Sequence, residues 1–253
     1  MVKKDRLDKL LVERGMVQSR ERARALIMAG KVVMDGKRVD KPGMQVSVDA
    51  EVHLQAKDSP YVSRGGEKME GALTAFAIDP RGMIVMDVGA STGGFTDCVL
   101  QKGASRVYAV DVGYGQLAWK LQKDPRVVIL ERRNIRYLKR EEVGEEIDLI
   151  LIDTSFISVE KFLPRLLGFL KKGGAILSLI KPQFEVGKGE VGKGGVVRDQ
   201  MKYEKVICRI SDFSRGLGLK VVGVVESPLL GQKGNREFFI YLKKEDEPLG
   251  AQA

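Results

Sequence analysis

The chain has 253 residues, 43% of them hydrophobic, which is enough for one large domain or for a medium domain and a small one. No apolar run approaches the ~18 residues of a membrane span. The opening MVKKDRLDKLL lacks the apolar core of a signal peptide, and two cysteines fit neither a disulfide framework nor a metal site. We therefore expect a soluble protein of the reducing cytoplasm that needs no metal.

The net charge of +9 is unevenly distributed along the chain. Residues 1–64 hold 14 lysines and arginines against 9 acidic residues, which leaves 29 against 25 for the rest. More than half of the excess positive charge therefore belongs to the first quarter. Such asymmetry indicates a polyanionic partner, although a generic solvated surface would give the same count.

The first quarter is predicted to be a small helix–helix–hairpin unit. Leucines at helical spacing predict a first helix, and Ser19 is a suitable N-cap for a second helix over 20–29. The dipeptide Asp35-Gly36 predicts a hairpin, and the valines of 46–54 predict a further short strand pair. Such a unit would gather cationic side chains on one side to neutralise phosphates: Arg20, Arg22, Arg24, Lys31, Lys37 and Arg38.

Within this unit, the stretch SRERARALIMAGKVVMDGKRVDKPG resembles the S4 RNA-binding module of ribosomal proteins and RNA-modifying enzymes. The resemblance covers roughly Arg6 to Leu54 and rests on a basic helix that runs into A-G-x-V-x-x-D-G. S4-type modules bind structured RNA, so the resemblance implies an RNA partner and adds Arg6 to the candidate phosphate contacts. We place this domain at residues 1–59, a polar, proline-punctuated linker at 60–66 and a second domain at 67–253.

The second domain is organised around Met83 to Gly94, which reads MIVMDVGASTGG. A short apolar run, a glycine-rich turn and a helix start are the parts of a nucleotide-type site, because glycines let backbone approach a ligand and a helix N-terminus offers free N–H groups. A glycine-rich turn without function is the alternative. The spacing is not that of a dinucleotide fingerprint, and a carboxylate favours the cationic methionine part of S-adenosylmethionine (SAM) over a pyrophosphate. The candidate SAM contacts are Asp87, Gly89, Ala90, Ser91, Thr92, Gly93 and Gly94.

Beyond Met83, apolar β-rich runs alternate with helical patterns, which is typical of a parallel, doubly wound α/β sheet. Strands are expected at 84–87, 106–111, 127–130, 147–153, 174–180, 220–227 and 237–243. Helices are expected at about 67–77, 94–102, 116–120, 159–170 and 200–217. The order resembles the SAM-dependent methyltransferase variant of the Rossmann fold. There the ligand lies beyond the carboxyl ends of the strands, where Asp111 would take ribose hydroxyls and Asn134 the adenine edge.

One glycine- and lysine-rich segment imitates a phosphate-binding P-loop. Residues 187–194 read GKGEVGKG, but Gly194 follows the second lysine where a serine or threonine would hold magnesium, and no strand leads directly in. We reject an ATPase on this ground. Residues 184–197 are instead expected to form a mobile loop beside the site, able to order on RNA.

The segment after the fourth strand narrows the methylation chemistry. Residues 153–156, DTSF, lack the proline-rich segment with which amino-group methyltransferases hold an exocyclic amine. Cys98 and Cys208 lie in predicted helices, away from the strand ends where a base-carbon methyltransferase would need its thiol. The remaining candidates match, residue by residue and in chain order, the K-D-K-E tetrad of ribose 2′-O-methyltransferases: Lys68, Asp153, Lys181 and Glu237.

The whole chain resembles the TlyA/hemolysin A family, in which an S4 module precedes a methyltransferase domain like that of FtsJ. The motifs that carry this resemblance are DVGASTGGFTD, VDVGYGQL, IDTSFIS, KPQFE and GNREFF. The family implies SAM-dependent 2′-O-methylation of cytidine in ribosomal RNA, with the RNA or ribosomal subunits as partner. A ribose hydroxyl must lose its proton as it attacks, and burial beside a second cation lowers the pKa of a lysine toward that task. Lys181 would be the base with Lys68 as the neighbouring cation, or the reverse.

The target nucleotide, the ribosomal subunit and the oligomeric state do not follow from the sequence. Two other readings stay open beside the methyltransferase. One is an RNA-binding ribosome-assembly factor whose methyltransferase fold has lost its chemistry. The other is a membrane-active hemolysin, which the absence of apolar spans disfavours.

Overall fold

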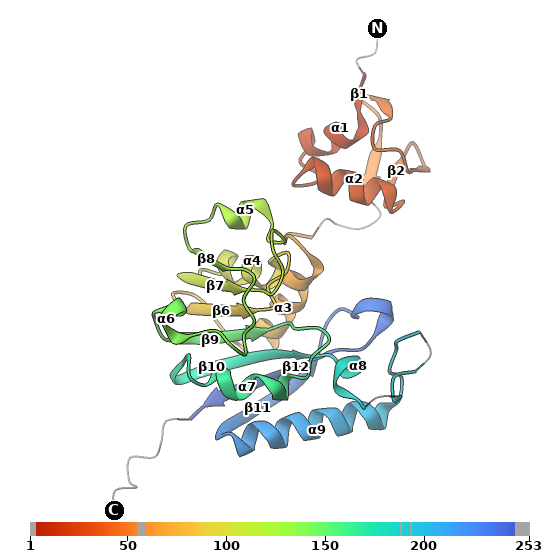
Figure 1. Ribbon diagram of the computed structural model, residues 1–253. Coiled ribbons are helices and arrows are strands. Elements are labelled where there is room, and N and C mark those ends of the chain that lie inside the picture. Colours follow the sequence, from red (N-terminus) through yellow and green to blue (C-terminus); the bar gives the residue numbers. More distant parts are fainter. Residues whose placement is uncertain (1–3, 55–58, 188, 193, 246–253) are drawn as a thin grey trace, which may run out of the picture. The chain divides into compact units, whose positions relative to one another are not determined.

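The computed structural model describes residues 4–54, 59–187, 189–192 and 194–245, and the chain forms two compact units, 1–60 and 61–253 (Figure 1). The first unit is a small α+β domain and the second a larger α/β domain. The predicted architecture, a Rossmann-like α/β domain with a seven-stranded, mostly parallel sheet after a small α+β unit, is confirmed. Each unit is described by itself.

The first unit packs two helices against short strands. Its elements are β1 (Lys4–Arg6), α1 (Leu7–Glu13), α2 (Arg20–Met28), β2 (Val32–Met34), β3 (Lys37–Val39), β4 (Gln45–Ser47) and β5 (Val52–Leu54). As predicted, the Ser19 hydroxyl caps α2 by accepting a hydrogen bond from the backbone N–H of Arg22 (3.2 Å). Leu7, Leu11 and Ile27 are fully buried and hold the two helices together.

The strands of this unit pair differently from the prediction. The valine-rich runs around 46 and 52 do form strands, β4 and β5, but these two strands are not partners. β4 pairs antiparallel with β1, and β5 pairs with β2 in the sheet β3-β2-β5. The prediction failed because β1 is three residues long, too short to give a periodic signal.

The second unit is built on a seven-stranded sheet. Its strands are β6 (Ile84–Val88), β7 (Arg106–Val110), β8 (Val127–Leu130), β9 (Ile147–Ile152), β10 (Leu170–Ile180), β11 (Leu219–Glu226) and β12 (Phe238–Lys244). They lie in the order β11-β12-β10-β9-β6-β7-β8. β12 runs antiparallel to both of its neighbours, whereas β6 to β10 pair in parallel. The strand order reverses at β6 and β9, because β7 and β8 are added on one side of β6 and β9 and β10 on the other. This switch point places a crevice above the carboxyl ends of the central strands.

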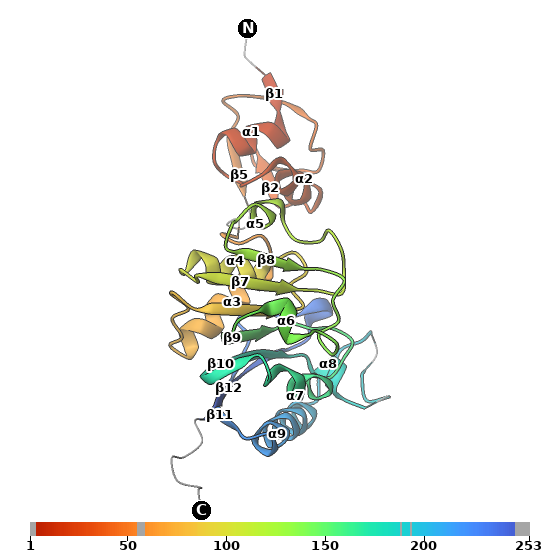
Figure 2. The same ribbon diagram turned by 60° about the vertical axis from the view of Figure 1, so that its left-hand side comes forward.

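Helices cover both faces of this sheet (Figure 2). They are α3 (Arg64–Ala75), α4 (Gly94–Gln101), α5 (Trp119–Gln122), α6 (Arg140–Val143), α7 (Leu163–Leu166), α8 (Pro182–Glu185) and α9 (Gln200–Gly216), with the 3₁₀ turns η1 (Val159–Lys161) and η2 (Gln232–Gly234). Successive strand residues serve opposite faces: Val85 packs with α3 and α4, and Met86 packs with α7 and α9. The strand sequences are therefore apolar throughout, as expected of a sheet buried on both sides.

Several predicted boundaries move in the structure. Helix α3 begins at Arg64 and not at residue 67, because the Ser63 hydroxyl accepts a hydrogen bond from the N–H of Gly65 (3.3 Å) and caps it. The segment predicted as a linker, 60–66, thus includes the start of a helix. The helix predicted at 116–120 is α5 at 119–122, and the one predicted at 159–170 is divided into η1 and α7. Among the described residues, no helix is long and apolar enough to span a bilayer.

Candidate active site

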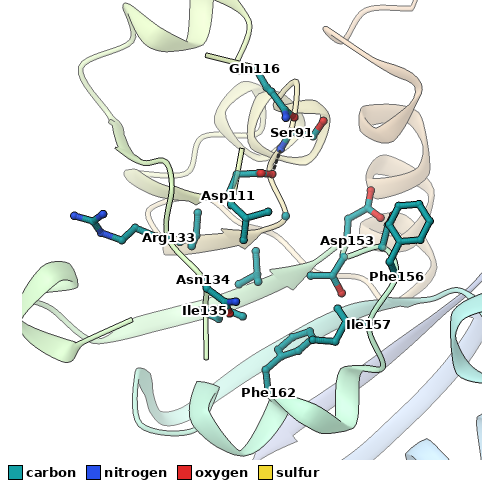
Figure 3. Close-up of a pocket in the computed structure, with 16 residues that line it drawn as sticks. Ser91, Asp111, Gln116, Arg133, Asn134, Ile135, Asp153, Phe156, Ile157 and Phe162 are labelled. Carbon is teal, nitrogen blue, oxygen red and sulfur yellow. Dashed lines mark hydrogen bonds between the residues drawn. The ribbon is translucent and has the colours of Figure 1, made fainter. Parts of the chain in front are cut away.

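Two adjoining cavities lie at the carboxyl ends of the central strands. The larger, of about 490 Å³, is bounded by residues that follow β6, β7, β8 and β9 (Figure 3). The smaller, of about 240 Å³, lies between the glycine loop after β6, the first turn of α3 and Lys181 at the end of β10. Gly89, Ser91, Asp153 and Ser155 line both cavities and so mark their junction.

The glycine loop is held close to the neighbouring strand. Gly89 has a φ of +86°, and a Cβ there would lie 2.6 Å from the carbonyl oxygen of Asp153. Gly93 has a φ of +88° and leads into α4. It lines neither cavity, and a Cβ there would collide with Leu117 and Leu121. Of the predicted SAM contacts in this loop, the cavity walls therefore contain all but Gly93, namely Asp87, Gly89, Ala90, Ser91, Thr92 and Gly94.

Asp87 is a fully buried carboxylate with one oxygen left over. Its Oδ2 accepts hydrogen bonds from the backbone N–H (3.0 Å) and the hydroxyl (2.6 Å) of Thr96. Its Oδ1 is buried and has no hydrogen-bond partner among the described residues, and Asp87 lines the smaller cavity. Burial raises the pKa of Asp87 to about 7, against the opposing effect of the Thr96 hydrogen bonds. A cationic group in the cavity would stabilise the ionised form.

Asp111 and Asn134 line the larger cavity, where they were predicted to bind ribose and adenine. Asp111 accepts hydrogen bonds from the N–H group of Ser91 (2.8 Å; Figure 3) and from that of Gly113 (2.7 Å), and the two fix the orientation of its carboxylate. The side-chain carbonyl of Asn134 accepts from the N–H of Arg136 (3.1 Å), so its amide NH₂ is the group available to a ligand. Ile135, Ile157 and Phe162 supply an apolar wall, which suits a planar ring.

The predicted tetrad gathers at the smaller cavity as two ion pairs. Lys68 Nζ lies 2.6 Å from Glu237 Oε2, and Lys181 Nζ lies 2.6 Å from Asp153 Oδ1. The Lys181 ammonium also donates to the hydroxyl of Ser155 (3.0 Å). Lys68, Asp153 and Lys181 line the cavity, whereas Glu237 is buried behind Lys68.

Residues that the sequence reasoning missed complete the smaller cavity. Ser63, Arg64 and Gly65 form one wall, and the Arg64 guanidinium donates to the carbonyl of Leu230 (2.8 Å) on the opposite wall. The serine, arginine and glycine pair directly before Lys68 were the available signal, but they were assigned to a linker. Ser155 was visible only as part of the DTSF segment.

Glu185, in α8, joins the segments that follow β9 and β10. Its Oε1 accepts from the N–H of Val159 (3.0 Å), and its Oε2 accepts from the Arg209 guanidinium (3.0 Å). Burial raises the pKa of Glu185 from its usual value. Phe156, on the first of these segments, has a φ of +65° and contacts the ring of Phe184 on the second, with centroids 4.7 Å apart.

Asn235 is buried and connects two loops near Glu237. Its amide donates to the carbonyls of Gly195 (3.0 Å) and Gln232 (3.1 Å), and its side-chain oxygen accepts from the N–H of Val197 (3.1 Å). Part of the predicted mobile loop, residues 195–197, is thereby attached to the loop that carries Glu237. Residues 188 and 193 of that predicted loop lie outside the described residues.

The predicted phosphate contacts in the first unit fall into two groups. Arg6 and Arg20 are both paired with Asp8, at 2.9 and 3.1 Å, and the pKa of this buried carboxyl is lowered to about 2, chiefly by its hydrogen bond from Arg6. The positive charges of Arg6 and Arg20 are therefore partly neutralised by Asp8. Arg22 is half-buried. The exposed cations of the prediction are Arg24, Lys31, Lys37 and Arg38, and the last two border a hollow of about 540 Å³ beside the β2–β3 hairpin.

The described residues contain no cluster of three or more histidine, cysteine, aspartate or glutamate side chains able to hold a metal ion. The arrangement is instead a pair of cavities with room for a nucleotide. Asp87, Lys68 and Lys181 all line the smaller cavity, and Lys181 lies beside its junction with the larger one. Such a site can bind a nucleotide that carries a cationic group and can exchange protons with a second molecule that enters beside the lysines.

Comparisons with known proteins show what the chain is similar to. Residues 61–244 match the FtsJ-like methyltransferase family and residues 5–52 match the S4 domain. The chain is 47% identical over its full length to the 16S/23S rRNA (cytidine-2′-O)-methyltransferase TlyA of Mycobacterium tuberculosis, of which it covers 95%. It is 39% identical over 93% of its length to hemolysin A of Brachyspira hyodysenteriae, of which it covers 98%. A solved structure from Streptococcus thermophilus, described as a hemolysin, superposes with a TM-score of 0.76 at 43% identity, over 98% of this chain and 91% of that one.

Proposed function

The chain belongs to the TlyA/hemolysin A group of FtsJ-like methyltransferases, and we propose that it transfers the methyl group of SAM to the ribose 2′-hydroxyl of a cytidine in ribosomal RNA. The single observation that carries the proposal is the meeting of the Lys181–Asp153 and Lys68–Glu237 pairs at a cavity whose other wall holds a buried, partly unpartnered acid. FtsJ-like methyltransferases use SAM, and an S4 domain together with rRNA-modifying relatives indicates an RNA substrate.

The residues present fit SAM as the methyl donor. The unpartnered Oδ1 of Asp87 suits the ammonium of a methionine moiety, and the neighbouring turn, Gly89 to Thr92, exposes backbone to the same cavity. In the larger cavity, Asp111 can accept hydrogen bonds from both hydroxyls of a ribose, and the Asn134 amide can donate to a purine edge. When bound, SAM supplies an electrophilic methyl group on its sulfonium, and the protein's task is to deprotonate and orient the attacking oxygen.

Lys181 is the better placed of the two lysines for the proton transfer. It contacts both Asp153 and Ser155, and these two residues line both cavities. Lys181 therefore lies at the junction, where the middle of an elongated nucleotide ligand would be. A ribose hydroxyl that enters there can displace the ammonium from Ser155 and, once the lysine is neutral, donate its proton to Nζ.

Lys68 and Glu237 hold the opposite side. Their pair is less accessible, since the side chain of Glu237 is 3% exposed against 25% for that of Asp153. The Lys68 charge favours loss of the proton from the attacking hydroxyl, while Glu237 fixes the position of Lys68. In-line placement of the attacking oxygen by these groups contributes much of the remaining acceleration.

The proposal is tested by Lys181→Met in the full chain. Transfer of tritiated methyl from SAM to bulk ribosomal RNA should fall at least about a hundredfold, because loss of a general base costs 10²–10⁴-fold. Calorimetric SAM affinity should stay within about twofold. Nuclease digestion and mass analysis of the product of the unaltered chain should detect 2′-O-methylcytidine.

Lys172→Met is the matched control, because Lys172 is exposed and lies at the other end of the sheet. It should methylate as the unaltered chain does. Near-normal turnover of Lys181→Met would remove Lys181 as the base. A methylated base in place of a methylated ribose would contradict the proposed reaction.

A further inference from the structure

Three large aromatic rings are exposed at the β8 edge of the sheet. Tyr114 and Trp119 lie in the connection between β7 and β8, Tyr137 lies in the connection after β8, and each is about 70% exposed. None of them lines either cavity of the candidate active site, and none belongs to a core cluster. A single exposed apolar residue is ordinary, but several large rings on neighbouring connections indicate an interaction surface.

A cation lies over each of the three rings. Lys123 Nζ is 4.4 Å from the centroid of Trp119, Arg132 Cζ is 4.3 Å from that of Tyr114, and Arg136 Cζ is 5.3 Å from that of Tyr137. All three distances fall within the ~6 Å range of cation–π attraction. The rings and cations are therefore arranged as pairs that face solvent together.

These three cations have no carboxylate partner among the described residues, unlike their neighbours. Arg126 is paired with Asp124 (2.7 Å) and Arg133 with Glu142 (2.7 Å). Residues 111–139 as a whole carry seven lysines and arginines against three acidic residues. The uncompensated charge thus coincides with the aromatic rings.

Hydrogen bonds join the two connections at residues 113–115 and 131–132. Arg132 donates its backbone N–H to the carbonyl of Gly113 (3.0 Å), and the N–H of Gly115 donates to the side chain of Glu131 (2.9 Å). α5, which starts at Trp119, lies beside β8 in both ribbon views (Figures 1 and 2). The same connections send Gln116 and Arg133 to the wall of the larger cavity, so this surface borders the site of methyl transfer.

We propose that the aromatic–basic surface, consisting of Tyr114, Trp119, Lys123, Arg132, Arg136 and Tyr137, binds unpaired nucleotides of the RNA substrate beside the methylation site. Bases stack on exposed aromatic rings, and cations at the ring faces neutralise the intervening phosphates. A second copy of this chain is a poorer occupant, because a two-fold contact would set these unpaired cations against each other. The inference rests on the proposed function, since it assumes an RNA substrate.

Trp119 is the chain's one tryptophan, so its fluorescence reports on this surface alone. Titration of the full chain with a decameric oligouridylate should quench the emission in a saturable way, because a base stacks on the indole. Tyr114→Ala combined with Tyr137→Ala should weaken binding at least about tenfold, since each stacked base contributes 1–3 kcal/mol by alanine substitution. Calorimetric SAM affinity of this variant should be unchanged.

Charge variants sharpen the test. Combining Lys123→Gln, Arg132→Gln and Arg136→Gln should reduce the slope of log affinity against log salt by about 2, at ~0.7 for each phosphate contact to single strands. A matched variant, Lys161→Gln with Lys172→Gln and Lys205→Gln, removes three exposed lysines outside the surface and should keep the slope. Trp119→Phe keeps an aromatic ring and should bind fluorescein-labelled oligouridylate with the affinity of the unaltered chain. Trp119→Ala removes the ring and should bind it more weakly.

Several outcomes would overturn the inference. One is unquenched Trp119 fluorescence together with unchanged RNA affinity of the tyrosine variant. Another is a dimer of the unaltered chain in light scattering that becomes a monomer in this variant. If the unaltered chain failed to methylate ribosomal RNA but Trp119 were quenched, the proposed reaction would fail while the surface stood. Normal methylation by the tyrosine variant, with the half-saturating RNA concentration of the unaltered chain, would reject the surface alone.

Discussion

Among the described residues, each unit has one carboxylate with no exposed surface, and the surroundings of the two differ. Asp8, in the first unit, pairs with Arg6 and Arg20, and its pKa is lowered to about 2. Asp87, in the second unit, has no cationic partner and one oxygen without a hydrogen bond among the residues that the structure describes, and burial raises its pKa to about 7. The difference separates structure from function: a buried acid whose partners are all internal stabilises a fold, whereas one that lacks a partner on a cavity wall suits a ligand.

Asp87→Asn should have the largest effect of the changes that test this contrast. The amide keeps an oxygen for Thr96 but loses the charge offered to the ligand, so SAM affinity should fall about 100-fold, in the range of hydrogen bonds to charged groups. The ligand-free chain should unfold at the same temperature or higher, because a buried carboxylate without a full set of partners has been removed. Isothermal and scanning calorimetry measure the two effects. A large drop in unfolding temperature with intact SAM affinity would mean that Asp87 is structural.

Asp8→Asn should give the opposite pattern. It leaves two arginines without their carboxylate and should destabilise the first unit by about 1–2 kcal/mol, a figure reduced for the exposure of both arginines. Hydrogen exchange of the α1 and α2 amides isolates this unit, and their protection should fall accordingly. SAM affinity should not change. An effect on SAM affinity as large as that of Asp87→Asn would dissolve the contrast.

The pH dependence of the two acids should also run in opposite directions. Because the pKa of Asp8 is lowered on folding, its stabilisation is present above about pH 4 and is lost as the pH falls toward 2. Because the pKa of Asp87 is raised on folding, its contribution to stability falls as the pH rises from about 4 to 7. Ionisation of Asp87 favours a cationic ligand, so SAM affinity should rise about tenfold between pH 6 and 8 in calorimetric titrations. Asp87→Asn should abolish that rise, and a rise that persists in this variant would assign it to another group.

The smallest expected effect concerns Glu185 of α8. Like Asp8, it is a buried carboxylate with both oxygens hydrogen-bonded, here to the Val159 N–H and to the Arg209 guanidinium. Glu185→Gln keeps an acceptor for the Val159 N–H but loses the ion pair with Arg209. We expect kcat to fall roughly threefold to tenfold, because α8, which directly follows Lys181, is held less firmly by Arg209 of α9. KM for SAM and the unfolding temperature should stay nearly constant. A parallel fall in unfolding temperature would make the residue structural and not a positioning residue.

The contrast also shows what the sequence could and could not predict. The glycine-rich turn after an apolar run was sufficient to place Asp87 at a ligand site, because strand, turn and helix start are local patterns. That its Oδ1 would lack a hydrogen-bond partner was not predictable, since this depends on which donors the tertiary structure places beside it. Gly93 carries the same local signal as its neighbours yet turns away from the cavity toward Leu117 and Leu121.

Long-range pairing was equally hidden. The four tetrad residues could be matched to a family pattern, but the partners Lys68 and Glu237 are 169 positions apart, and no local rule pairs them. In the first unit, the prediction of Arg20 as a phosphate contact did not include its ion pair with Asp8, which the structure shows. The exposed rings of Tyr114, Trp119 and Tyr137 gave no periodic signal, because they stand on irregular connections.

The reversed direction of β12 has a consequence for the newly made protein. In the parallel strands, the residues nearest the cavities are at the end of each strand. In β12, which runs the other way, the corresponding residue is Glu237, directly before the strand begins. A chain still on the ribosome can thus have built its glycine turn, Lys68, Asp153 and Lys181 while the carboxylate that anchors Lys68 has yet to be synthesised. The Lys68–Glu237 pair therefore forms only after residue 237 has been added to the chain.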